Sequence, residues 1–335
     1  MNILRVQSST FSNAYKPQLK PACPIKPLGA DTVTFGSNAD PKHVSNIAKI
    51  QKYPVKVVFS DLDGTILYDH KPSEGSLEAI ESLKEAGIPL VLTTGRSRKE
   101  VQPVLELLGI DRPDYLITEQ GAIIFDKDGN EIFNDTMSKK DARRTIKCAE
   151  KYAKIDENIR LLFYIGGKVY ATSNITGGEA HMTNPIVKES YDEILAMGNP
   201  TRITFVKLDS EKAEDLNGLL NFVNKKLKWH GLNAFESGSV YNCEVMKKST
   251  TKGNAAKEVA KRMGVSLKNA AALGDASNDI KMIETIGKFK GLSVAMGNAT
   301  EELKNKARMI TDDVQERGFA KAIQAMLNMN DKYAN

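Results

Sequence analysis

The clearest signal in this chain is Val57-Val58-Phe59-Ser60-Asp61-Leu62-Asp63-Gly64-Thr65. Its apolar half has the length and composition of a strand that is buried on both faces of a parallel sheet. Two carboxylates, Asp61 and Asp63, follow where this strand ends, and Gly64 allows the backbone to turn sharply. The stretch therefore predicts a strand that delivers acidic side chains to the carboxyl end of an α/β sheet, where such folds bind ligands.

A second acidic cluster, Gly274-Asp275-Ala276-Ser277-Asn278-Asp279, also comes directly after an apolar run. In a doubly wound sheet, two strand ends of this kind can converge on one site. Carboxylates gathered there would repel one another strongly, so a bound cation is the simplest explanation. Oxygen ligands without a nearby histidine or cysteine favour Mg²⁺ over zinc. The alternative, that Asp-Gly pairs merely end strands in Asx turns, explains one cluster better than two.

Apolar runs of strand length alternate with helix-patterned segments on both sides of these clusters, which predicts a parallel sheet covered by helices. A helix over 74–86 should bury Leu77, Ile80 and Leu83. The next helix, over 98–108, could begin at a capping box of Ser97 and Glu100 or near Pro103. The expected strands are 55–60, 90–94, 115–118, 271–274, 293–296 and 309–311.

The middle third of the chain breaks this rhythm. Between residues 126 and 245, strand-like pairs such as 160–164 with 168–172 alternate with long helical patterns such as 140–152 and 210–226. The βαβ pattern resumes with a helix over 254–263. We therefore expect an α/β fold with a doubly wound parallel sheet in a discontinuous core, 53–125 and 246–335, and an inserted α+β domain over 126–245.

The charge is distributed unevenly. The 335 residues carry 47 Lys+Arg against 42 Asp+Glu, a formal net charge of +5. Residues 1–52 hold seven basic and two acidic side chains, which accounts for the whole excess. The charge-balanced body argues against a nucleic-acid partner. The first 52 residues also contain five prolines and no hydrophobic period, so we expect a disordered basic leader, untargeted rather than an organelle transit peptide.

Cysteine content and hydropathy bear on the compartment. Three widely spaced cysteines fit neither a disulfide framework nor a zinc site. No apolar run approaches the roughly 18 residues of a membrane span. These features predict a cytoplasmic protein with no membrane partner.

Four ordered motifs resemble the haloacid dehalogenase (HAD) superfamily, specifically its Cof-type hydrolases with a type IIB cap. The resemblance covers about residues 55–327. The motifs are Asp61-Leu62-Asp63-Gly64-Thr65, Leu92-Thr93-Thr94-Gly95-Arg96, Lys252-Gly253 and Gly274-Asp275-Ala276-Ser277-Asn278-Asp279. The stretch Val294-Ala295-Met296-Gly297-Asn298-Ala299 is also similar to this subfamily.

The resemblance implies a Mg²⁺-dependent phosphatase that acts through an aspartyl-phosphate. Asp61 would be the nucleophile, and Asp63 the acid/base, which implies hydrolysis of an ester. Thr94 and Lys252 would stabilise the phosphoryl group, with Lys247 and Lys248 as weaker candidates for the lysine role. The substrate contacts are expected at Gly95, Arg96 and Asn278, although Arg96 could equally be solvated. The metal ligands are expected at Asp61, Asp63 (through its carbonyl), Asp275 and Asp279.

One departure from the family is visible, because Gln120-Gly121-Ala122 stands where the family usually has Asn-Gly-Ala. The implied substrate is a small phosphorylated metabolite, either a sugar phosphate or a phosphorylated cofactor, for a monomer or homodimer. A sugar phosphomutase is the first alternative, and it would need several cap arginines; the candidates are Arg143, Arg144, Arg160 and Arg202. A non-catalytic binding module, the remote alternative, would be expected to lack at least one motif.

Overall fold

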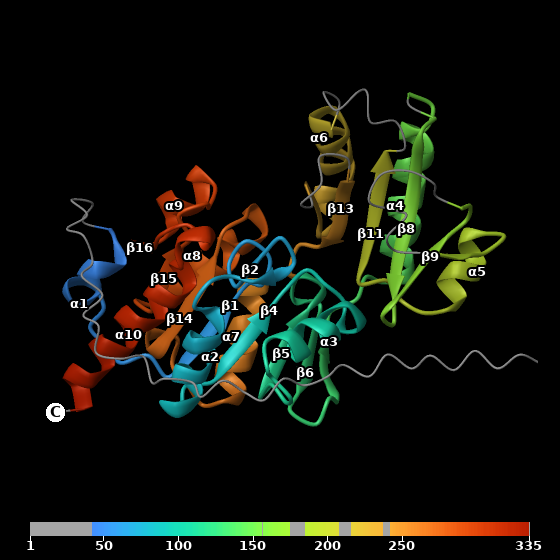
Figure 1. Ribbon diagram of the computed structural model, residues 1–335. Helices are drawn as coiled ribbons and strands as arrows, with labels where there is room; N and C mark the ends of the chain where they lie inside the picture. Colours follow the sequence, from blue (N-terminus) through green and yellow to red (C-terminus); the bar gives the residue numbers. More distant parts are fainter. Residues whose placement is uncertain (1–41, 156, 175–184, 208–215, 237–241, 335) are drawn as a thin grey trace, which may run out of the picture. The chain divides into compact units, whose positions relative to one another are not determined.

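A computed structural model of the chain describes residues 42–155, 157–174, 185–207, 216–236 and 242–334 (Figure 1). Residues 1–41, most of the predicted leader, lie outside this described part. Statements about structure below refer to the described residues.

The core domain is built on an eight-stranded sheet in which the first six strands pair in parallel, and the last two are joined to it by antiparallel pairings. Its first strand, β1, is completely buried, as its apolar sequence predicts. In spatial order the strands are β16 (Met309–Ile310), β15 (Leu292–Ala295), β14 (Ala270–Gly274), β1 (Val57–Ser60), β4 (Leu90–Thr93), β5 (Tyr115–Thr118), β6 (Ile123–Asp126) and β7 (Glu131–Asn134). This confirms the predicted α/β fold with a parallel sheet.

The connections place a topological switch point between β1 and β14. From β1 the chain passes through α2 (Ser76–Glu85) to β4 on one side, whereas from β14 it passes through α8 (Ile280–Lys288) to β15 on the other. Right-handed crossovers in opposite directions put these helices on opposite faces. Ligands bind at such switch points. The core also contains α3 (Arg98–Leu107), α7 (Lys252–Arg262), α9 (Glu301–Lys306), α10 (Gly318–Ala334) and the hairpin β2 (Leu67–Tyr68) with β3 (Lys71–Pro72).

The inserted domain, called the cap below, has its own six-stranded sheet. The spatial order is β10 (Ile186–Val187), β9 (Lys168–Ala171), β8 (Ile159–Ile165), β11 (Arg202–Lys207), β13 (Asn242–Lys247) and β12 (Leu232–Glu236). Among the described residues of the cap, the α-helices are α4 (Lys139–Tyr152), α5 (Tyr191–Ala196) and α6 (Leu216–Leu227).

The two faces of the cap sheet differ. Ile203 and Phe205 of β11 join a large apolar cluster with residues of all three cap helices. Because side chains alternate along a strand, Arg202, Thr204 and Val206 lie on the opposite face. There Val206 belongs to a separate small cluster, whose members in the described part of the chain all come from strands β8, β9 and β11. This second face therefore carries the buried polar side chains of β11, Arg202 and Thr204.

The strand pairing corrects the expected domain boundaries. Residues 126–134 were assigned to the insertion, but they complete β6 and form β7 of the core sheet. At the other end, β13 extends the cap sheet to Lys247, beyond residue 245. Antiparallel edge strands added to a parallel sheet do not follow the βαβ rhythm, and this is why the sequence pattern ended the core too early.

The expected disordered leader is also too long. Residues 43–50 form a short 3₁₀ turn and α1 (Ile47–Ile50), with Val44 and Ile47 buried. The backbone N–H of Ile310 donates to the carbonyl of Lys42, which anchors this segment on the edge strand β16. Two apolar side chains spaced three apart are too few for a periodic signal, so this docking was missed.

The predicted helices need smaller corrections. In α2, Leu77 is 46% exposed and is not part of the buried face, which Ala79, Ile80 and Leu83 form instead. The start of α3 is settled by Glu100, whose carboxylate accepts a 2.7 Å hydrogen bond from the N–H of Ser97. Pro103 lies inside the helix. No helix in the described part of the chain is long and apolar enough to cross a membrane.

Candidate active site

The acidic residues of the two clusters meet at the carboxyl ends of β1 and β14. These strands are direct parallel neighbours, with Ser60 paired to Leu273, and the Asp61 N–H donates to the Leu273 carbonyl. One carboxylate oxygen each from Asp61, Asp275 and Asp279 lie within 4.8 Å of one another. The structure thus brings together three of the four aspartates that the sequence singled out.

The turn after β1 is shaped by the second cluster. Gly64 has φ +80°, and a Cβ there would lie 2.3 Å from Oδ2 of Asp275. The Thr65 hydroxyl donates a 3.0 Å hydrogen bond to Oδ1 of the same carboxylate. Asn298, in the loop after β15, donates from Nδ2 to the Gly64 carbonyl and accepts the Val314 N–H at Oδ1. It therefore links the turn after β1 to the segment that follows β16. Only glycine fits where the backbone passes so close to Asp275.

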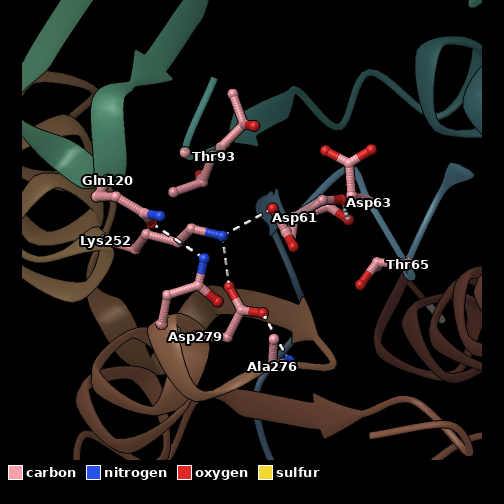
Figure 2. A network of polar contacts seen from close by, with 12 residues as sticks. Asp61, Asp63, Thr65, Thr93, Gln120, Lys252, Ala276 and Asp279 are labelled. Atoms are coloured by element: carbon pink, nitrogen blue, oxygen red, sulfur yellow. Dashed lines mark hydrogen bonds and ion pairs between the residues drawn. The ribbon is translucent and has the colours of Figure 1, made fainter. Parts of the chain in front are cut away.

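Lys252, the first residue of α7, lies between two of the carboxylates (Figure 2). Its ammonium nitrogen is 2.7 Å from Oδ1 of Asp61 and 2.7 Å from Oδ1 of Asp279, and the residue is 1% exposed. Lys247, one of the competing lysines, pairs with Asp135, and Lys248 is exposed. Lys252 is therefore the lysine that could act at Asp61.

Both carboxylate oxygens of Asp279 accept hydrogen bonds. Oδ1 accepts from Lys252, and Oδ2 accepts the backbone N–H groups of Asp275 and Ala276, each at 3.1 Å. Asp279 consequently fixes the ammonium group and the backbone of its own loop. Its remaining lone pairs suit a water-mediated contact with a cation better than a direct one.

The group formed by Asp61, Asp275, Asp279 and Lys252 has an excess of negative charge. Burial, and then repulsion from Asp279, raise the pKa of Asp61 well above its ordinary value. The same two causes raise the pKa of Asp275 to about 7. Burial alone would lower the pKa of Lys252, but Asp279 and Asp61 outweigh it and the net shift is upward. One ammonium group therefore faces three carboxylates, and a divalent cation would restore the balance.

The donor set fits a hard cation. Asp61 and Asp275 offer carboxylate oxygens that are not all consumed by protein donors, and no histidine or cysteine belongs to the group of potential ligands in the described residues. Mg²⁺ prefers such all-oxygen sites with few protein ligands and several waters. The site thus has the chemistry that the sequence predicted for Mg²⁺.

Asp63 lies apart from this group. Its side chain is 48% exposed and points away from the Lys252 ammonium (Figure 2). Arg96 holds it in a bidentate ion pair, with Nε 2.8 Å from Oδ2 and Nη2 2.5 Å from Oδ1. The hydrogen bonds that Arg96 donates to Asp63 raise the pKa of Arg96. Nη2 of Arg96 is also 3.4 Å from Nδ1 of His70. Arg96 is thus neither merely solvated nor free, an arrangement that the sequence did not predict.

Residues 94–96, called the Thr94 loop below, follow the strand next to β1. Thr94 is 1% exposed, and its hydroxyl oxygen accepts the N–H of Arg96 at 3.1 Å. Gly95 lies beneath Gln120, because a Cβ at Gly95 would be 2.5 Å from the Gln120 amide nitrogen. The loop is therefore compact, and the Thr94 side chain is held at the end of β4.

Gln120, where the family usually has asparagine, binds Asn278. Its Oε1 accepts a 3.0 Å hydrogen bond from Nδ2 of Asn278. Oδ1 of Asn278 is buried without a hydrogen-bond partner among the described residues. Glu119 and Gln120 both have left-handed backbones, with φ 48° and 61°. Such strain is found at functional sites and persists only where surrounding contacts impose it.

The comparisons with known proteins agree with this geometry. A profile of the haloacid dehalogenase-like hydrolases matches residues 58–323. The chain is 28% identical over 296 residues to phosphatase YwpJ of Bacillus subtilis, covering 82% of this chain and all of that protein. It is also 28% identical over 271 residues to the 5-amino-6-(5-phospho-D-ribitylamino)uracil phosphatase YcsE of the same organism, with 81% and 95% covered.

Solved structures give the same match. A haloacid dehalogenase-like hydrolase from Bacteroides thetaiotaomicron superimposes with a TM-score of 0.66 at 24% sequence identity, covering 82% of this chain and 99% of that one. At this identity the similarity shows the fold.

Proposed function

The chain belongs to the haloacid dehalogenase-like hydrolases and is a phosphatase of this family, and we propose that it hydrolyses small phosphate monoesters through an aspartyl-phosphate on Asp61. The observation that carries the proposal is the bridge that buried Lys252 makes between Asp61 and Asp279. A lysine held against one oxygen of a carboxylate leaves the other oxygen free to attack phosphorus. Its positive charge also lies where negative charge accumulates on the phosphoryl oxygens.

The covalent step forms a bond between an Asp61 oxygen and phosphorus while the bond from phosphorus to the ester oxygen breaks. The departing alkoxide takes its proton from Asp63, which the Arg96 fork orients. In the second step Asp63 takes a proton from water, the water oxygen attacks phosphorus, and Asp61 is released. The separation of the two side chains supports this division of labour, because the acid/base must face the leaving group and not the Lys252 ammonium.

Thr94, Gly95 and Asn278 are proposed as further contacts to the phosphoryl group. Asn278 is oriented by Gln120, and its buried Oδ1 still lacks a partner. A buried polar atom without a partner is unfavourable, and a bound ligand or water would complete it.

Mg²⁺ is the proposed cofactor, held by Asp61, Asp275 and the backbone carbonyl of Asp63, with Asp279 contacting it through a water molecule. When bound, it supplies Lewis-acid polarisation of a phosphoryl oxygen and neutralises the charge that these carboxylates accumulate. The raised pKa values of Asp61 and Asp275 support this assignment, because a nearby cation would favour their ionised forms.

The proposed substrates are sugar phosphates or phosphorylated cofactors, and the similarity to YcsE, a phosphatase of a phosphorylated ribitylaminouracil, supports a small phosphorylated metabolite. The alternative of a phosphomutase finds little support in the cap. Each of its four arginine candidates has a partner, and three of these partners are acidic: Asp192 for Arg143, Asp141 for Arg144 and Glu244 for Arg202, whereas Arg160 donates to carbonyls. Arginines so engaged are poor candidates for a second phosphate site.

We further propose that the protein works in the cytoplasm, as a monomer or homodimer. Cys148 and Cys243 are free and buried, which suits a reducing compartment.

The test is turnover of a panel of phosphate esters with Mg²⁺ by the wild type, Asp61→Asn and the exposed control Asp69→Asn. Asp61→Asn should lower kcat by at least about a thousandfold, because the nucleophile is lost, whereas Asp69→Asn should stay within twofold. Equal rates for the wild type and Asp61→Asn would refute the mechanism. Conversion of a hexose 1-phosphate to its 6-phosphate without release of free phosphate would decide for the mutase.

A further inference from the structure

The three carbonyl groups of the Thr94 loop are each held by a donor from outside the loop. The first accepts the N–H of Gln120 and the third accepts the N–H of Glu119, each at 3.0 Å. The middle one, of Gly95, accepts from Nη1 of Arg202, also at 3.0 Å. Two of the donors come from the core turn after β5. The third is a cap side chain, on the first residue of β11.

Arg202 is built into the cap and is not a surface arginine that happens to reach the core. It is 6% exposed, and Nη1 lies 3.2 Å from Oε1 of Glu244 on the neighbouring strand β13. Its guanidinium carbon is 3.8 Å from the centre of the Tyr164 ring on β8. Burial alone would lower the pKa of Arg202, but Glu244, Tyr164 and Glu119 together outweigh it and the net shift is upward. The head group is therefore charged and fixed from two sides before it meets Gly95.

This buried pair is incompletely satisfied. Nε of Arg202 and Oε2 of Glu244 have no hydrogen-bond partner among the described residues. A buried ion pair with unpaired atoms adds little to stability, and apolar residues could replace it on a face where Leu162 and Val206 are buried. Packing alone does not explain an arginine at this position. Its bond to Gly95 does.

The residue before Arg202 reaches the same part of the core. The Thr201 hydroxyl donates to the buried Glu119 carboxylate, and the N–H of Glu119 holds the third carbonyl of the loop. Burial raises the pKa of Glu119. Two successive cap residues thus act on the Thr94 loop, Arg202 directly and Thr201 through Glu119.

We propose that Arg202, oriented by Glu244 and Tyr164, is a positioning residue that holds the Thr94 loop from the cap in its productive geometry. The loop carries the Thr94 hydroxyl and the arginine that grips Asp63, so the proposal rests on the proposed phosphatase function for its kinetic consequence. Without Arg202 the Gly95 carbonyl loses its donor while the loop keeps its two core contacts. A displacement of about 1 Å in such a site can cost about a hundredfold in rate.

The first test needs no turnover. Hydrogen–deuterium exchange of a peptide containing residues 94–96 is compared in the wild type, Arg202→Met, Arg202→Lys and Arg143→Met. Arg143 is the matched control, because it is an ion-paired cap arginine whose partner, Asp192, also lies in the cap. Exchange in this segment should become several-fold faster in Arg202→Met, partly recover in Arg202→Lys and stay unchanged in Arg143→Met. Unchanged exchange in Arg202→Met would overturn the proposal.

The second test separates positioning from simple stabilisation. With p-nitrophenyl phosphate and Mg²⁺, Arg202→Met should lower kcat by about tenfold to a hundredfold while KM changes less than about threefold. Arg202→Lys should recover part of kcat, since one ammonium can still reach a carbonyl. In a double-mutant cycle, Arg202→Met should cost less in a Thr94→Ala background, because there the positioned hydroxyl is already absent.

Full additivity in that cycle, or a kcat equal to that of Arg143→Met, would overturn the proposal. If the wild type hydrolyses no phosphate ester, the proposed function fails, and the exchange measurement still decides whether Arg202 holds the loop.

Discussion

The core sheet and the cap sheet place their buried charges in different ways. In the core, the charged residues follow the ends of β1 and β14, and Asp61 and Asp275 each stand within two residues of their strand. In the cap, Arg202 and Glu244 come from neighbouring strands, and they meet Tyr164 only through strand pairing. The positions of the core aspartates can be read from the sequence, because they follow strand ends. The cap group forms only when the strand register is set.

The charge balance differs as well. The core group sets three carboxylates against one ammonium, so it has an excess of negative charge that invites a cation. The cap group pairs one guanidinium with one carboxylate. The core site should therefore respond strongly to Mg²⁺ and pH, and the cap pair should act through geometry.

The largest effect expected in the core comes from Lys252. Lys252→Met should lower kcat by about a thousandfold or more, because it removes the positive charge that faces Asp61 and leaves two buried carboxylates unpaired. Lys252→Arg serves as a second variant that keeps the charge, and exposed Lys248→Met is the control. Steady-state kinetics and thermal unfolding are measured together. A folded Lys252→Met protein with at least a tenth of the wild-type kcat would show that the core group does not depend on this charge.

The second prediction concerns pH and Mg²⁺. The pKa of Asp275 is about 7 in the folded protein and about 4 in an unfolded chain. The stability associated with its protonated form is thus present below about pH 4 and is lost as pH rises through 7. Without Mg²⁺, Tm should fall between pH 5 and 8. Mg²⁺ should raise Tm more at pH 8 than at pH 5, because it binds the ionised carboxylates.

Asp275→Asn is the comparison for this prediction. It should flatten the fall of Tm in metal-free protein and reduce the gain from Mg²⁺. A wild-type Tm gain from Mg²⁺ that is the same at pH 5 and pH 8 would contradict the assignment of Asp275 to the cation site.

The contrast also explains how much the sequence could predict. The α/β fold, the parallel strands and the meeting of Asp61 with Asp275 follow from apolar runs that end in acidic residues, since parallel strands share one carboxyl edge. The place of Lys252 at a helix start favours it over Lys247 and Lys248 for the lysine role, and in the structure its ammonium group bridges Asp61 and Asp279.

What the sequence could not give depends on pairing or on contacts across long separations. Arg202 and Glu244 are 42 residues apart and meet through the register of β11 with β13. The sequence leaves Arg96 either facing substrate or solvated, whereas in the structure its partner is Asp63, 33 residues earlier. The docking of residues 43–50 on β16 and the antiparallel strands β6 and β7 likewise leave no periodic signal. The sequence offers a hint only in the alternation of polar and apolar residues along 202–205.

A smaller effect is expected at Gln120, the residue that departs from the family pattern. Gln120→Asn keeps a side chain that tolerates the left-handed backbone but shortens it by one methylene, so the hydrogen bond to Asn278 is lost selectively. We expect kcat/KM to fall by about tenfold, the value of one hydrogen bond. The exposed change Gln102→Asn is the control. An unchanged kcat/KM would mean that Asn278 is positioned without Gln120.

The smallest effects are expected from two buried threonines, one in each region. Thr118 in the core and Thr204 in the cap are at most 2% exposed, and neither hydroxyl has a partner among the described residues. Replacing each by valine removes an unpaired polar group at nearly constant shape. The free energy of unfolding should therefore stay the same or rise by up to about 1 kcal/mol, with kcat unchanged. Urea unfolding and steady-state kinetics of Thr118→Val and Thr204→Val measure this.

The two variants divide the possibilities between the regions. If Thr204→Val alone raises KM, the polar face of the cap sheet binds substrate directly, and Arg202 does more there than hold the Thr94 loop. If Thr118→Val alone lowers kcat, the hydroxyl at the end of β5 has a catalytic partner, and the core group extends one strand further than β4. If neither variant changes KM or kcat, each hydroxyl is only an unpaired polar group tolerated in its own sheet. The core group would then remain the catalytic one, and the cap pair would act only by holding the Thr94 loop.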